Sequence, residues 1–144
     1  MIATPLPTAE DINVHDSLDE RHACRVFFGK SIAEAEALFR ENALFYSEDL
    51  LWMGPVGFQF YLAAYINYLL SPASAGDSDG INCFTGLLEF RTQQDSAALI
   101  PIQEVVTKAC HKLVKDFAKF EANPDFYGPL SSRLELVAKR ISTA

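Results

Sequence analysis

The sequence contains a run of 27 residues without a charged side chain, from position 50 to position 76. Its apolar centre covers residues 58–70, which is shorter than the ~20 apolar residues that a transmembrane helix needs, and Gln59 and Asn67 interrupt it. Pro55 stands where proline is favoured, in the first turn of a helix. The run therefore predicts no membrane span, but an apolar helix at about residues 55–70, buried at the centre of the fold.

Start signals for helices recur along the chain, whereas strand signals are weak. Capping boxes, in which a serine precedes a glutamate by three residues, occur at Ser17, Ser31 and Ser132. The first two predict helices at 17–28 and 32–41, the latter ending at Asn42, and the third predicts a final helix through Ile141. Further helices are predicted at 47–52 with Ser47 as cap, at 81–92 with Ser78 or Asp79 as cap, and at 99–120.

These signals predict an all-α fold. We expect one compact domain over residues 1–144, with about six helices around the central one and residues 1–14 as an extended N-terminal segment. A chain of 144 residues buries enough surface to fold without metals or disulfides.

The charge of the chain is uneven. The net charge is −7, and the 12 acidic against 4 basic residues of positions 1–80 account for it, whereas positions 81–144 are almost neutral. An acidic chain argues against nucleic-acid binding, and the lysines along residues 108–119 fit a solvated helix face. A basic protein partner would be steered toward the acidic half. The candidate contact residues are Asp11, Asp16, Asp19, Glu20, Asp77 and Asp79.

No arrangement of residues typical of catalysis, of a metal site or of a cofactor site is evident. The three cysteines (Cys24, Cys83 and Cys110) lack metal-binding spacing and lie among apolar residues, which predicts buried, reduced thiols and a cytoplasmic protein. The first residues lack the pattern of a signal peptide. We therefore expect a protein that is not an enzyme and that holds no metal or cofactor.

The central segment resembles a family of small, uncharacterised bacterial proteins. The likeness lies in a short helix, a break and an F-x-x-Y-L-x-A-Y helix, matched here by Phe58, Tyr61, Leu62, Ala64 and Tyr65, and it extends over about residues 31–120. This resemblance implies an all-helical fold and no catalytic residues. Small acidic proteins of this kind often belong to toxin–immunity pairs.

Three functions remain open from the sequence. The first is a bacterial immunity protein that binds and neutralises a cognate secreted toxin, or another basic protein, through an acidic surface. The second is a small-molecule-binding or enzymatic domain with a site near Tyr61, Tyr65, Tyr68 and Asn67. The third is a structural homo-oligomer, such as a homodimer, that uses exposed aromatic residues, with Phe45, Trp52 and Tyr127 as candidates.

Overall fold

The chain forms helices of very unequal length. The computed structural model describes residues 5–144, and this part of the chain contains no β-strand. Helices of ten or more residues are α2 (Leu18–Phe27), α3 (Ile32–Trp52), α4 (Pro55–Leu70), α5 (Ser78–Gln94), α6 (Gln103–Lys115) and α8 (Leu130–Ser142). Single-turn helices α1 (Ala9–Ile12) and α7 (Pro124–Tyr127) and 3-10 segments η1 (Pro72–Ser74), η2 (Ser96–Ile102) and η3 (Phe117–Phe120) complete the chain. The prediction of one all-α domain of about six helices is confirmed.

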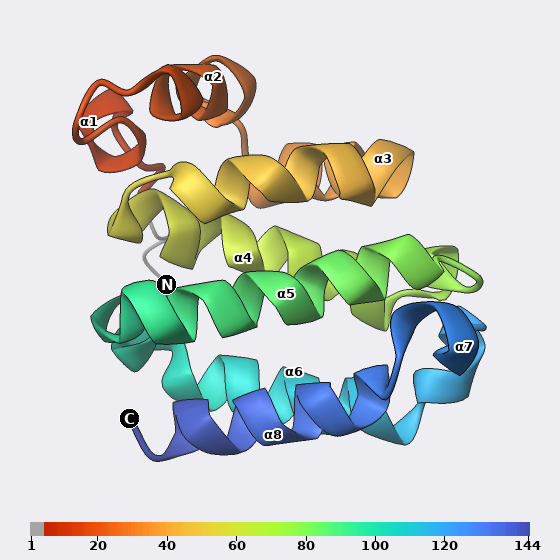
Figure 1. Cartoon of the computed structure of the whole chain (residues 1–144). Helices are drawn as coiled ribbons and strands as arrows, with labels where there is room; N and C mark the ends of the chain where they lie inside the picture. Colours follow the sequence, from red (N-terminus) through yellow and green to blue (C-terminus); the bar gives the residue numbers. More distant parts are fainter. Residues whose placement is uncertain (1–4) are drawn as a thin grey trace.

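The long helices lie in a stack, with α4 at its centre (Figure 1). α1 and α2 cover one end of the stack beside α3, and α6 and α8 pack together at the other end. α4 contacts α1, α3, α5 and α6, and its residues Phe58, Leu62 and Tyr65 have no exposed surface. The predicted buried central helix is confirmed. No helix within residues 5–144 is long and apolar enough to cross a membrane.

A buried tyrosine of α4 fixes the link between α2 and α3. The Tyr61 hydroxyl donates to the carbonyl oxygens of Phe27 and Lys30, at 2.7 and 2.9 Å. Burial raises the pKa of Tyr61 to about 12, so the phenol remains a neutral donor. This bond satisfies a polar group that would otherwise destabilise the core.

Two further tyrosines of α4 fix the start of α5. The Tyr65 hydroxyl donates to the Gly80 carbonyl at 2.6 Å, in the first turn of α5. The Tyr68 hydroxyl donates to Oδ2 of Asp77 at 2.5 Å, and Asp77 is the N-cap residue of α5. The central helix therefore positions its neighbours through hydrogen bonds as well as through apolar contacts.

A buried arginine holds the end of α3 against α5. Nη2 of Arg91 donates to the carbonyl oxygens of Leu50 and Met53, which the end of α3 leaves without helical partners. Its guanidinium carbon lies 4.3 Å from the centre of the Phe58 ring. Only 5% of Arg91 is exposed, and burial lowers its pKa. These contacts fix the separation between α3 and α5.

Two of the three predicted capping boxes are confirmed. The hydroxyls of Ser17 and Ser31 each accept a backbone N–H three residues later at 3.1 Å. The box at Ser132 is wrong, because α8 begins at Leu130 and Ser132 lies inside it. Pro129 precedes the helix as its N-cap residue, with a φ of −80°, near the value that its ring imposes, and a non-helical ψ of 65°, so the helix begins directly after it.

The residue that starts α5 differs from the prediction. Asp77 caps the helix by accepting the Gly80 N–H at 2.9 Å, and neither Ser78 nor Asp79 does so. A Cβ at Gly80 would lie 2.4 Å from Oδ2 of Asp77. The glycine therefore leaves room for the capping carboxylate.

The break predicted at Asn42 is present, but Asn42 has a second role. Its backbone is non-helical, with φ −162° and ψ 83°, and it kinks α3. Its side-chain oxygen accepts the Phe45 N–H at 3.1 Å, which caps the second part of the helix. Ser47, the predicted cap, instead lies inside the helix and donates to the Leu44 carbonyl at 3.2 Å.

Two other predicted segments are subdivided. Residues 1–14 are not extended throughout, because residues 9–12 form α1, which begins with a capping box at Thr8; residues 1–4 lie outside the described part. The helix predicted at 99–120 is interrupted. Pro101 lies in η2, and the α-helical part covers only α6 before η3 follows.

The bond between α4 and α5 gives a first testable prediction. We expect Tyr65→Phe to lower the free energy of unfolding by about 1 kcal/mol, because a buried hydrogen bond is lost while the ring remains. Tyr46→Phe is the matched control, since no hydrogen bond of the Tyr46 hydroxyl is present within residues 5–144. Urea unfolding measures both variants, and equal stability of the two would contradict the structural role of Tyr65.

Candidate functional site

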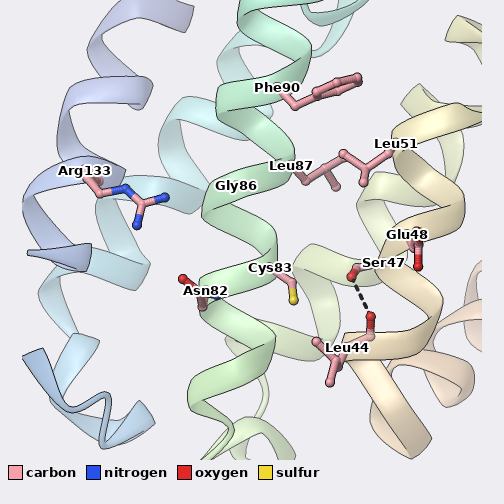
Figure 2. A pocket seen from close by; sticks show the side chains of 10 residues that line it. All are labelled: Leu44, Ser47, Glu48, Leu51, Asn82, Cys83, Gly86, Leu87, Phe90 and Arg133. Carbon is pink, nitrogen blue, oxygen red and sulfur yellow. Dashed lines mark hydrogen bonds between the residues drawn. The ribbon is translucent and has the colours of Figure 1, made fainter. Parts of the chain in front are cut away.

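A groove of about 450 Å³ runs along the outer face of α5, between α3 and α8 (Figure 2). We call it the α5 groove. Leu44 and Leu51 of α3 form one wall, and Arg133 of α8 lies on the opposite side. The floor comes from α5, where its residues include Cys83, Gly86, Leu87 and Phe90.

The spacing of residues along two helices creates this groove. Leu44, Glu48 and Leu51 follow one another at intervals of four and three residues, which places them on one face of α3. The same spacing occurs on α5, where either Gly86 or Leu87 lies three or four residues from both Cys83 and Phe90. Figure 2 shows Leu51 and Leu87 directed toward each other across the groove. Two helical faces thus meet side by side and leave an apolar channel between them.

The glycine in the floor meets no structural requirement within residues 5–144. A Cβ added at Gly86 would meet no heavy atom of this part of the chain within 4 Å, and the backbone there has ordinary helical geometry. By contrast, a Cβ at Gly54 would lie 2.5 Å from the Asp11 carbonyl oxygen. Glycine inside a helix costs about 0.5–1 kcal/mol relative to alanine. Gly86 therefore reduces stability without relieving any close contact.

The charged residue on one side of the groove has an ion-pair partner, and the charged residue on the other side does not. Arg133 is neutralised by Glu89, to which its Nε donates at 3.1 Å and its Nη2 donates as well. Glu48 is exposed and forms no ion pair with any residue in 5–144. The groove therefore presents an apolar floor with one unpaired carboxylate at its edge.

The structure divides the predicted acidic contact residues between two places. Asp11, Asp16, Asp19 and Glu20 lie in and around α1 and α2, where the Asp11 carbonyl approaches Gly54 at the start of α4. Asp77 and Asp79 follow the other end of α4, which is about 24 Å long at 1.5 Å per residue. The six residues therefore do not form one surface.

Glu20 is a structural residue rather than a contact residue. Only 4% of it is exposed, and its carboxylate accepts the backbone N–H groups of Val14, His15 and Ser17 and the Ser17 hydroxyl. Burial opposes its ionisation, but these hydrogen bonds prevail and lower its pKa to about 2. The carboxylate of Glu20 therefore stays ionised, and donors inside the fold stabilise its charge.

The other acidic candidates differ in whether their carboxylates are already bonded within the fold. Asp11 accepts the Thr8 N–H as part of the cap of α1, and Asp16 binds Arg21 through two bonds of 2.8 Å. Asp77 bonds to Tyr68, and Asp79 accepts the Tyr127 hydroxyl at 2.6 Å. Of the six residues, the structure assigns no hydrogen bond or ion pair within 5–144 to the side chain of Asp19.

The alternative site on the tyrosine face of α4 lacks free polar groups. The hydroxyls of Tyr61, Tyr65 and Tyr68 are all bonded within the fold, and their rings are buried. Asn67 lies on the exposed side of the helix, away from these rings. The tyrosines therefore serve the packing of the helix.

The three predicted surface aromatics are not one patch. Trp52 and Phe45 are 41% and 52% exposed, and Trp52 packs edge-on against Phe90 of the α5 groove. Tyr127 is bonded to Asp79 near the start of α5, and its neighbour Phe126 is the more exposed ring. Only Trp52 among the three thus extends the groove.

Histidine and cysteine side chains form no cluster. Residues 5–144 contain no group of three or more side chains able to hold a metal ion. Nδ1 of His22 lies 2.7 Å from Oδ1 of Asp49, whose other oxygen has no hydrogen-bond partner among the described residues, and burial raises the pKa of Asp49. Burial also raises the pKa of Cys110 to about 12 and keeps it a thiol.

The role of Glu20 gives a prediction about pH. Because the folded-state pKa lies below the ordinary glutamate pKa of about 4.5, Glu20 stabilises the fold above that pH, and the contribution is lost as pH falls toward 2. We expect Glu20→Gln to lower stability by about 2 kcal/mol at pH 7, since the variant loses the charge that these donors bind. The deficit should shrink below pH 4.5.

Urea unfolding at pH 7, 4 and 3 measures this dependence. Glu41→Gln is the control, because Glu41 is exposed and we expect a change of at most about 0.5 kcal/mol. A deficit that stays constant from pH 7 to pH 3 would refute the assigned role of the Glu20 charge.

Comparisons with known proteins add no identification. No protein-family model, no curated protein and no solved structure matches the chain. The resemblance over residues 31–120 therefore stays a prediction, and the function has to be argued from the geometry and chemistry of the α5 groove.

Proposed function

We propose that this protein is a non-enzymatic protein-binding module, an immunity protein that binds and neutralises a cognate bacterial toxin, and that the toxin docks in the α5 groove. The proposal rests on one observation, the presence of a glycine at position 86 where the described chain leaves room for a side chain. A glycine that lowers helix stability and relieves no contact within residues 5–144 is explained by a partner that approaches the backbone closely. The apolar floor and walls around it would be covered in the complex.

The charge distribution supports a basic partner. Glu48 offers an unpaired carboxylate at the groove, and the first 80 residues carry the acidic excess of the chain. Such a field raises the rate of association with a basic protein and weakens as salt screens it. The acidic residues of α1 and α2 then contribute to steering at a distance, while the groove provides the contact.

A variant of the glycine separates folding from binding. We expect Gly86→Ala to raise the free energy of unfolding by about 0.5–1 kcal/mol, because alanine favours the helix and its methyl group meets no atom of the chain. The same methyl group enters the space of the docked partner. The affinity for the cognate toxin, which the proposal expects to be encoded beside the gene of this protein, should therefore weaken at least about tenfold, equivalent to 1.4 kcal/mol.

The measurements are urea unfolding and the affinity for that toxin. Gln93→Ala on the same helix, outside the groove, is the control for a helix-stabilising change that leaves binding intact. Unchanged toxin affinity of Gly86→Ala would refute docking in the groove. Lack of any binding by the wild-type protein to the neighbouring toxin would refute the immunity function itself.

A further inference from the structure

The α5 groove holds about 450 Å³ and lies between the faces of two helices, α3 and α5. We infer that its occupant is an amphipathic α-helix of a basic partner protein, with a small residue against Gly86 and a lysine or arginine against Glu48. This inference rests on the proposed function and specifies the structural element and the chemistry that the groove recognises.

The helical form of the occupant follows from the walls. Leu44 and Leu51 lie two turns apart on α3, and Cys83, Leu87 and Phe90 follow at intervals of four and three residues on α5. Each row forms a ridge that complements the grooves of another helix. An apolar helix face inserts side chains between such ridges, and a small residue lets the backbones approach at Gly86. Residues 5–144 offer no strand edge to which an extended peptide could add.

The charge of the occupant follows from the pairing of the groove's ionic residues. Arg133 already binds Glu89, whereas Glu48 has no cationic partner in the described chain. A cation on the docked helix would complete this pairing. A second copy of this chain fits less well, since an isologous dimer through the groove would bring two copies of the same unpaired carboxylate to one interface.

A selection experiment on the full chain tests the inference. The probe is a displayed library of 18-residue peptides, randomised without helix bias and selected against the wild-type protein. Binders are then counter-screened against Gly86→Leu, whose side chain fills the groove from a position with open space. Gln93→Leu is the matched control, and thermal unfolding verifies that both variants fold.

We expect groove-dependent binders to share a helical apolar pattern with a small residue and a nearby lysine or arginine, and to bind Gly86→Leu at least tenfold more weakly than Gln93→Leu. Selection against Glu48→Lys should replace the basic residue by aspartate or glutamate.

Three results would overturn the inference. Groove-dependent binders with an extended or proline-rich pattern would refute the helical occupant and leave the proposed binding function standing. A basic preference that persists in Glu48→Lys would refute the role of Glu48. Concentration-dependent dimers in light scattering, abolished by Gly86→Leu, would assign the groove to a second copy.

Discussion

Three tyrosine hydroxyls on the uncharged helix α4 need hydrogen-bond acceptors, and the positions of these acceptors determine how the neighbouring helices are arranged. α4 is buried on most of its surface, so each buried hydroxyl must find an acceptor within the protein. Tyr61 finds it where α2 meets α3, and Tyr65 and Tyr68 find it in the first turn and at the cap of α5. These acceptors lie at the ends of the neighbouring helices. The same helix that supplies the apolar core therefore also fixes where its neighbours begin.

The central helix was predictable from the sequence because its apolar residues, their spacing and the absence of charge all indicated a buried helix. Capping at Ser17 and Ser31 was predictable for a similar reason, since each cap is a local interaction of residues three apart. The prediction at Ser132 was wrong because a proline three residues earlier offered a start of its own. The prediction at α5 was wrong because three neighbouring residues could each cap the helix, and Asp77 is the one whose carboxylate accepts both the Gly80 N–H and the Tyr68 hydroxyl of α4. Local signals thus located the helices, and at α5 a contact with the preceding helix accompanies the choice of the first residue.

The candidate site was less accessible to sequence reasoning. Its walls come from segments about 40 residues apart, and on α3 they come from the part that follows the kink at Asn42. The acidic candidates were chosen for charge, but charge alone does not distinguish a carboxylate that caps a helix from one that faces a partner. Glu20 and Asp77 belong to the first kind. The one usable signal was a glycine in the middle of an amphipathic segment, which becomes informative only when the structure excludes an internal reason for it.

The interactions that stabilise the core also prepare the groove. Tyr65 and Tyr68 fix the first turn of α5, and Arg91 ties its last turn to the end of α3. The floor and the wall of the groove are thus held at both ends, so the proposed docking would cost little ordering entropy. Within such a rigid frame the small stability cost of Gly86 is tolerable, because the contacts that define the frame do not involve it. A groove built in this way can lose local helix stability at one residue and keep its shape, which is what the proposed recognition of a closely packed helix would require.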